Sequence, residues 1–141
     1  MGGLQEYLDG WRAGSIEPPV TALIGIKLLA VGEGTAELEL RAGKQHHNPM
    51  GSVHGGILCD LADAAMGVAM ASSLNEGETF GTVELHINYF RSVRESMLTA
   101  TGRMVRRGRT TGYVECEIAD ETGTLVAKAS SCCLIQGEPD P

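Results

Sequence analysis

The residues best suited to chemistry lie in one short stretch, NPMGSVHGGILCDLADAA. Here His54 precedes the pair Gly55 and Gly56, and two acids, Asp60 and Asp63, stand among apolar or small residues. An aspartate that is buried without a partner is costly, so these acids must be hydrogen-bonded, exposed or used in a reaction. A carboxylate of this kind can activate water or attack a carbonyl carbon itself.

The glycine pair suits an anion-binding turn at the start of a helix. N–H groups in the first turn of a helix have no internal acceptor and carry the positive end of the helix dipole. Gly55 and Gly56 would therefore offer uncovered donors to an oxyanion. Two plainer interpretations stay open: the glycines make only a tight turn, and Asp63 is a solvated acid one turn from Asp60.

The spacing between these groups limits how they can act together. Gly55 and Asp63 are eight residues apart, which is about 12 Å along a helix axis. One helix cannot direct both groups at the same carbon atom. If both act on one carbonyl, they must come from different subunits whose helices lie side by side and run in opposite directions. The functional interpretation therefore predicts an obligate dimer.

Hydrophobic periodicity predicts the elements that position these residues. Apolar residues at helical spacing predict a short amphipathic helix over residues 3–13, ended by Gly14 and a break at Pro18-Pro19. The alternation in TAELELRA predicts a half-buried strand that pairs with the run around residues 24–31. The chain therefore begins with a helix and a β-hairpin.

The segment from about residue 55 to residue 74 has apolar residues almost all round a helix, so we expect a long helix enclosed on most sides. Four strand-like runs joined by short turns follow it: FGTVELHINYF, SMLTATGRMV, TTGYVECEIAD and TLVAKASSCCLI. This order predicts an α+β fold in which an antiparallel sheet curls round one central helix. At 141 residues the chain fits a single domain.

Charge and composition argue against several classes of partner. The net charge of -7 disfavours binding to nucleic acid or to an anionic membrane. The apolar stretch from residue 57 to residue 74 contains Asp60 and Asp63. Each aspartate would cost about 2.5–3.5 kcal/mol near the centre of a bilayer, which favours a buried helix over a membrane span. The start of the chain has no basic and apolar leader, so we expect a cytoplasmic protein.

The spacing of histidine and cysteine predicts no metal site. No pair among the four histidines has the spacing of a known ligand set. The four cysteines, two of them adjacent, show no C-x-x-C pattern, and we expect them to be reduced core thiols. The sequence also lacks the glycine patterns of serine hydrolases, kinases and dehydrogenases.

Arginine gives this acidic chain one basic segment. Six of the eleven basic residues lie between positions 91 and 109, where Glu95 is the only acid. Residues 106–109 fall at an expected hairpin turn, where arginines either bind phosphate groups or form a solvated turn.

Taken together, these motifs resemble the signature of hot-dog-fold acyl-CoA thioesterases, most closely the phenylacetate-degradation type. The resemblance runs from about residue 20 to residue 136 and includes INYFRSV, RRGRTTGYVECEI and DETGTLVAKASS in the expected order. It implies one hot-dog domain over residues 20–136, after an N-terminal helix and linker at 1–19 and before a tail at 137–141. The central motif is Asn48-x-x-Gly51-x-x-His54-Gly55-Gly56, followed by Leu61-x-Asp63.

The resemblance implies a role for each residue around the start of the helix. It implies that the N–H of Gly55 polarises the thioester carbonyl, with Asn48 beside it, and that His54 lies near the departing sulfur. Asp63 of the partner subunit is implied to be the catalytic carboxylate, with Asp60 a bystander. Whether Asp63 activates water or attacks the carbonyl directly stays open.

Further residues follow from the same resemblance. Thr82 is implied to hold the attacking water, because the position one turn after the acid, which is threonine in other branches, is Gly67 here. Coenzyme A is part of the substrate, so no cofactor is implied, and the assembly is expected to be at least a homodimer and to form a homotetramer. The residues expected to bind coenzyme A are Arg91, Arg106, Arg107, Gly108 and Arg109.

Two other functions stay in consideration. A hot-dog hydratase or dehydratase acting on enoyl thioesters would need a His and Asp pair on a different helix start. A non-catalytic module that binds acyl-CoA would keep the arginines but make Asp63 dispensable. The acyl group itself is open among aryl-acetyl, benzoyl and medium-chain groups.

Overall fold

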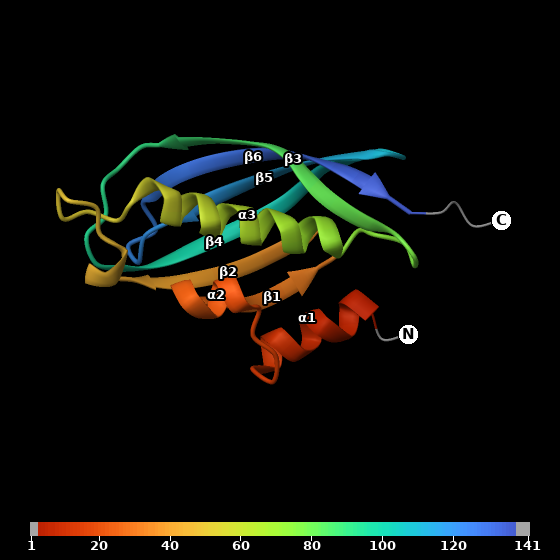
Figure 1. The fold of residues 1–141 in the computed structure, drawn as a ribbon. Coiled ribbons are helices and arrows are strands. Elements are labelled where there is room, and N and C mark those ends of the chain that lie inside the picture. Colours follow the sequence, from red (N-terminus) through yellow and green to blue (C-terminus); the bar gives the residue numbers. More distant parts are fainter. Residues whose placement is uncertain (1–2, 138–141) are drawn as a thin grey trace.

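The computed structural model describes residues 3–137, which form three α-helices, one short 3-10 turn and six strands (Figure 1). The helices are α1 (Gly3–Ala13), α2 (Pro19–Ile24) and α3 (Gly55–Ala71), and the turn is η1 (Lys44–His46). The strands are β1 (Ile26–Gly32), β2 (Thr35–Ala42), β3 (Thr79–Tyr89), β4 (Ser96–Arg107), β5 (Thr111–Ala119) and β6 (Leu125–Gln136).

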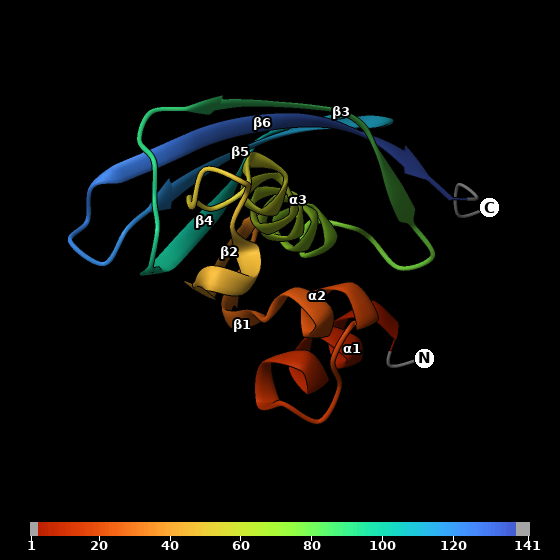
Figure 2. The same ribbon diagram turned by 60° about the vertical axis from the view of Figure 1, so that its left-hand side comes forward.

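The six strands form one antiparallel sheet in the order β1-β2-β4-β5-β6-β3. The sheet arches over one side of α3, and α1 and α2 lie on the other side (Figure 2). The predicted sheet curled round one central helix is therefore confirmed. Because β3 ends this strand order, its outer edge has no partner strand within residues 3–137.

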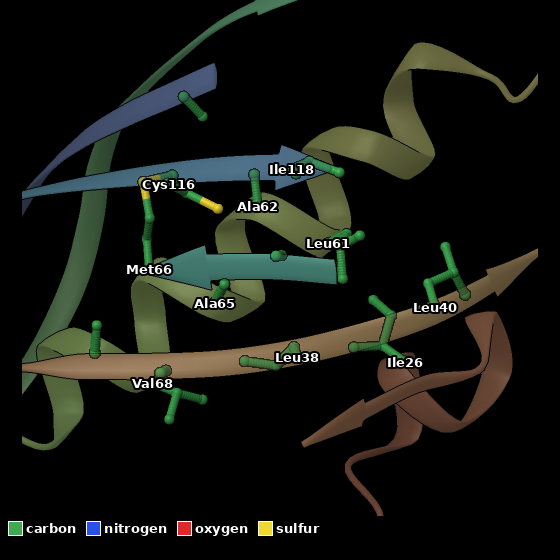
Figure 3. Close-up of a cluster of buried hydrophobic side chains, with 14 of the residues drawn as sticks. Ile26, Leu38, Leu40, Leu61, Ala62, Ala65, Met66, Val68, Cys116 and Ile118 are labelled. Carbon is green, nitrogen blue, oxygen red and sulfur yellow. The ribbon is translucent and has the colours of Figure 1, made fainter. Parts of the chain in front are cut away.

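The core fills the space between α3 and the concave face of the sheet (Figure 3). Leu61 and Met66 of α3 are completely buried, as are Leu38 of β2 and Val114 of β5. Full burial of each such side chain contributes about 1.5–3 kcal/mol to the stability of the fold. Gly102 lets β4 approach α3 closely, because a Cβ at this position would collide with the carbonyl group of Ala65.

Several predicted bounds are confirmed. The helix over residues 3–13 and the strand over residues 35–42 have the predicted limits, and all four later strands lie within two residues of theirs. The central helix is shorter than predicted and ends at Ala71, with Ser72 as its C-cap. Oγ of Ser72 donates to the carbonyl of Ala69 at 2.8 Å.

The predicted end of the first helix is confirmed, because residues 14–18 are not helical, but a second helix was not predicted. This helix, α2, begins at Pro19, directly after Pro18 at its N-cap. Proline suits this position because its fixed φ is helical and its missing N–H would have had no acceptor there. Strand β1 consequently starts at Ile26, two residues later than expected. Of the expected tail at 137–141, residues 138–141 lie outside the described part of the chain.

The predicted core thiols are confirmed in part. All four cysteines are free, but only Cys116 and Cys133 are buried, whereas Cys59 and Cys132 are partly exposed. Among the helices of residues 3–137, none is long and apolar enough to cross a membrane.

Candidate active site

The first turn of α3 presents an uncovered backbone donor. His54 stands at the N-cap, and its Nδ1 accepts a hydrogen bond from the N–H of Gly56 at 2.9 Å. The N–H of Ile57 donates to the carbonyl of His54 at 2.9 Å. The N–H of Gly55 has no acceptor among residues 3–137. The donor that the sequence singled out for an oxyanion is therefore the one that the cap leaves open.

Tyr89, which the sequence analysis missed, holds this turn from the end of β3. Its Oη donates to the carbonyl of Gly55 at 2.8 Å and lies 3.2 Å from Sγ of Cys59. Burial, and then the contact with Cys59, raise the pKa of Tyr89 to about 12, so the phenol stays neutral near pH 7. A Cβ on residue 55 would lie 2.9 Å from Oη of Tyr89, so a larger residue there would require the tyrosine or the first turn of α3 to shift.

Asp63 lies two turns further along α3, beside Thr82 of β3. Oγ1 of Thr82 donates to Oδ1 of Asp63 across 3.4 Å, a long hydrogen bond. Partial burial raises the pKa of Asp63, the bond from Thr82 opposes that rise, and the negative charge of Asp60 adds to it. The structure therefore brings Asp63 and Thr82 together, and the charge of Asp60 is near enough to affect the pKa of Asp63. All three side chains remain accessible from solvent in the single chain.

The raised pKa of Asp63 predicts how activity depends on pH. A carboxylate that acts as base or nucleophile must be ionised, so activity should fall as the pH drops through the pKa of Asp63, which lies above the usual 3.8. Because the bond from Thr82 lowers that pKa, Thr82→Val should move the acid limb of the kcat/KM profile to higher pH. Asp60→Asn should move the acid limb to lower pH. If both variants moved the acid limb in the same direction, Asp63 would not be the group whose ionisation controls activity.

Asp63 and Thr82 stand where two hollows meet. The first, of about 320 Å³, lies between α1, α2 and α3 and is lined mainly by apolar side chains, among them Trp11 and Phe80. The second, of about 370 Å³, is an open hollow along β3 that Cys59 also lines. A carboxylate at the mouth of an apolar pocket with few polar groups is the usual arrangement of a small-molecule site.

Within one chain the two halves of the site do not meet. Gly55 lies in the first turn of α3, and Asp63 is eight residues further on, about 12 Å along the axis. Strand β3 repeats this separation, because Tyr89 contacts Gly55 at one end and Thr82 contacts Asp63 nearer the other. Any reaction that needs both groups at one carbon atom needs a second chain.

Asn48 turns its side chain into its own loop. Its Oδ1 accepts from the N–H groups of Met50 at 3.0 Å and Ser52 at 3.2 Å, and its Nδ2 donates to Oγ of Ser52 at 3.2 Å. These bonds shape the loop that leads into His54. In the described structure Asn48 therefore supports the site from the loop, while the Gly55 N–H is the uncovered donor.

The arginine turn lies at the opposite end of α3 from Gly55. Arg107, half buried, pairs with Glu78, which directly precedes β3, and also donates to the carbonyl of Gly108 at 2.6 Å. Gly108 suits the close approach of the chain in this turn, because a Cβ there would lie 3.0 Å from the carbonyl oxygen of Thr111. Arg106 and Arg109 are exposed, which leaves their side chains accessible to phosphate groups.

Arg91 lies apart from that turn. It follows β3, near the end that contacts Gly55, and its Nη1 is 4.0 Å from Oδ2 of Asp120. The basic segment of the sequence is therefore divided between the two ends of α3, which span about 25 Å over 17 residues.

A sequence profile, related sequences and solved structures all agree on the kind of protein that this chain resembles. The sequence profile of the thioesterase superfamily matches residues 50–127. The chain is 32% identical over 111 residues to the 1,4-dihydroxy-2-naphthoyl-CoA hydrolase of Listeria monocytogenes, covering 79% of this chain and 89% of that one. Among solved structures, the PaaI protein of Escherichia coli, from the phenylacetic acid degradation operon, superposes with a TM-score of 0.83 at 25% identity, covering 94% of this chain and 95% of that one. The phenylacetic acid degradation-related protein of Ralstonia eutropha superposes with a TM-score of 0.81 at 28% identity, covering 91% and 98% of the two chains.

Proposed function

The chain belongs to the thioesterase superfamily, in its phenylacetic-acid-degradation group of hot-dog thioester hydrolases, and from that premise we propose that it hydrolyses acyl-CoA to a carboxylate and free coenzyme A. The observation that supports this proposal is that one helix carries both an oxyanion donor and a carboxylate. The helix cap leaves the N–H of Gly55 without an acceptor, and Asp63 lines an apolar pocket. Thioester hydrolysis can use the first group to stabilise the oxyanion and the second to activate water or attack the carbonyl carbon.

The proposed chemistry uses these groups in sequence. The N–H of Gly55 donates to the thioester oxygen and stabilises the negative charge that develops on it, an effect worth roughly 2.7–4 kcal/mol per donor. Asp63 either takes a proton from the attacking water or attacks the carbonyl carbon itself, forming an anhydride that water then opens. In the first route, Asp63 returns the proton that it took from water to the coenzyme A thiolate as the C–S bond breaks. In the second route, the thiolate leaves and takes a proton from solvent, which hydrolysis of the anhydride restores. In both routes His54 lies beside the leaving sulfur, and Thr82 holds the water near Asp63.

A second chain completes the site in this proposal. Strand β3 is an edge strand of 11 residues, exposed along most of its length. If two copies pair their β3 edges antiparallel about a twofold axis near the middle of the strand, Thr82 of one copy lies opposite Tyr89 of the other. Those residues mark the positions of Asp63 and Gly55, so the pairing brings the carboxylate of one chain to the N–H of its partner. Assembly of two such dimers into a homotetramer stays a prediction.

The apolar hollow between α1, α2 and α3 supports binding of the acyl group. Its volume of about 320 Å³ falls at the lower end of the range for small-molecule pockets, and this accommodates an aryl-acyl group such as phenylacetyl or hydroxyphenylacetyl, or a medium-chain acyl group. Polar lining is concentrated at the end where Asp63 and Thr82 stand.

The arginine turn supports binding of the coenzyme A phosphates, and it yields a prediction. Removing Arg106 and Arg109 together should raise KM for an acyl-CoA by up to roughly tenfold, because each exposed ion pair contributes about 0.2–1 kcal/mol and a tenfold change is about 1.4 kcal/mol. KM for the matching acyl-pantetheine, which lacks the nucleotide phosphates, should not change. Arg107→Ala serves as the comparison, since loss of its pair with Glu78 should lower stability more than affinity. An equal rise in KM for both substrates would show that Arg106 and Arg109 do not bind the nucleotide phosphates.

The experiment that tests the proposed function is release of free thiol from acyl-CoA. Native protein would be incubated with phenylacetyl-CoA, hydroxybenzoyl-CoA, hexanoyl-CoA and lauroyl-CoA, and the thiol measured with a chromogenic disulfide. We expect turnover of at least one substrate. If every substrate bound and none was cleaved, the chain would be a binding module and the hydrolytic proposal would fall.

A further inference from the structure

Among the four histidines, which all lie in the described part of the chain, only His46 is buried. It ends the short turn η1 and is 5% exposed, whereas His47 is partly exposed and His54 and His86 are exposed. The proposed chemistry gives His46 no task. A buried polar ring is costly unless its nitrogen atoms are hydrogen-bonded, so the partners of this ring show what it holds in place.

Both ring nitrogen atoms of His46 are hydrogen-bonded to backbone groups. Nε2 lies 2.8 Å from the carbonyl oxygen of Ile24, and because a carbonyl oxygen can only accept, Nε2 carries a proton and donates. Nδ1 accepts from the N–H of Gly43 at 3.2 Å. The ring is therefore neutral and fixed in one orientation between the end of α2 and the loop that follows β2.

The backbone of His46 leads directly to the proposed oxyanion donor. Its carbonyl oxygen accepts a hydrogen bond from the N–H of His54 at 2.8 Å. His54 is the N-cap of α3, and the next residue along the chain is Gly55. One hydrogen bond and one residue therefore separate His46 from the Gly55 N–H, the donor that the cap leaves open.

Helix α2 gives this loop a fixed point outside itself. Ile24 is the last residue of α2, where carbonyl groups have no donor within the helix, and the Nε2–H of His46 supplies one. Among residues 3–137, no backbone hydrogen bond joins the loop over residues 43–54 to α2. The ring of His46 therefore makes the hydrogen bond that ties this loop to the helix.

A second anchor holds the same loop on its other side. Nε2 of His47 donates to the carbonyl of Arg94 at 2.7 Å, and the N–H of Val53 donates to the carbonyl of Val93 at 2.7 Å. Because one of these bonds joins two backbone groups, no single side chain carries this anchor. The anchor at α2 differs, since it depends on one ring.

From these contacts we propose that His46 is a positioning residue for the Gly55 N–H: its ring fastens the loop before α3 to the end of α2 and thereby directs the oxyanion donor at the thioester oxygen. The inference rests on the proposed function, which gives the Gly55 N–H its role. His46 acts through His54 and touches no reacting atom. It serves the half of the shared site that supplies the donor, and not the half that supplies Asp63.

Two substitutions at His46 separate its two hydrogen bonds. His46→Asn keeps an oxygen that can accept from Gly43 but is too short to reach Ile24, whereas His46→Gln keeps an N–H that can reach it. With hexanoyl-CoA, His46→Asn should lower kcat by roughly tenfold to a hundredfold and leave KM nearly unchanged, because a 1 Å misplacement can cost about 10²-fold. His46→Gln should retain most of the native kcat.

The matched control is His47→Asn, which removes the neighbouring histidine ring from the second anchor. The backbone bond from Val53 stays in place, so this variant should keep kcat near the native value. Release of free thiol gives kcat and KM, and circular dichroism reports the fold. A native kcat in His46→Asn, or an equal loss in all three variants, would overturn the proposal.

Mixed dimers show on which half of the shared site His46 acts, since Ile24 also lines the hollow beside Asp63. His46→Asn chains would be produced together with Asp63→Asn or with Gly55→Ala chains, and the doubly tagged dimers tested for thiol release. With Asp63→Asn, one site combines an intact Asp63 with a well-placed Gly55, so about half the native activity should return. With Gly55→Ala, neither site has a well-placed donor, and activity should stay low.

The outcomes distinguish this inference from the proposed function. Activity with Gly55→Ala but not with Asp63→Asn would place His46 in the half that contains the hollow, and equal activity in both mixed dimers would give it a role in general stability only. Either result would overturn the inference and leave the hydrolysis intact. If native protein cleaved no acyl-CoA, both proposals would fall. If His46→Asn chains did not fold, His46→Phe, which keeps a ring without either hydrogen bond, would replace them with the same expected results.

Discussion

An Asp63→Asn variant is expected to lose acyl-CoA hydrolysis by roughly 10²–10⁴-fold in kcat, with little change in KM, because the amide can neither accept the proton of water nor attack the carbonyl carbon. The substitution keeps the size of the side chain and a hydrogen-bond acceptor for Thr82, so the helix and the pocket should persist. The raised pKa of Asp63 marks it as the acid that the environment perturbs. Free thiol released from hexanoyl-CoA, with circular dichroism for the fold, provides the measurement.

The matched control is Asp60→Asn, which removes the neighbouring carboxylate from the same face of α3. It should retain most of its activity and change chiefly the pH profile, because Asp60 acts on Asp63 only through its charge. If Asp60→Asn were inactive and Asp63→Asn active, the two acids would have been assigned in the wrong order.

A Gly55→Ala variant is expected to lower kcat by about 10²-fold, the scale of a 1 Å misplacement of a catalytic group. The added Cβ would lie 2.9 Å from Oη of Tyr89 and 3.0 Å from its Cζ, so the first turn of α3 or the tyrosine ring must shift. A shift of the first turn moves the N–H that we propose as the oxyanion donor, and a shift of the ring breaks the hydrogen bond from Tyr89 that holds this turn. The measurement is the same release of free thiol, with KM determined alongside kcat.

Two further variants separate misplacement from general damage. Gly81→Ala adds the same methyl group on β3 where a Cβ meets no atom within 4 Å, and it should leave kcat near the native value. Tyr89→Phe alone removes the hydrogen bond to the Gly55 carbonyl without adding a Cβ, and it should lower kcat less than Gly55→Ala does. A native kcat for Gly55→Ala would argue that the Gly55 N–H does not act in catalysis.

The sequence predicted most of the fold because its periodic segments coincide with its buried faces. The α1 pattern of Leu8 and Trp11, and the alternation that buries Leu38 and Leu40 in β2, depend only on local spacing. The order of the strands in the sheet did not follow from periodicity, because it depends on contacts between residues far apart in the chain. Helix α2 was missed because a Pro-Pro pair is compatible with either a break or a helix start.

The residues of the candidate site that lie close together in the sequence could be predicted from one motif. Those that reach the site through contacts between distant parts of the chain could not. Gly55 and Asp63 stand in one stretch of sequence, whereas Tyr89 is 34 residues from Gly55 and belongs to no motif. For Arg107 the local pattern was misleading. The basic segment around it suggested phosphate binding, but Arg107 pairs with Glu78, which is 29 residues away in the sequence. The apolar hollow likewise lies between α1, α2 and α3, which no local pattern could indicate.

The central claim is that Asp63 of one chain acts with Gly55 of its partner, and mixed dimers test it most directly. Asp63→Asn and Gly55→Ala chains would be produced together with different affinity tags, and the doubly tagged dimers purified and tested for thiol release from acyl-CoA. One of the two sites in such a dimer combines an intact Gly55 with an intact Asp63, so we expect about half the native activity from two nearly inactive parents. Mixed dimers as inactive as their parents would contradict a site shared between subunits.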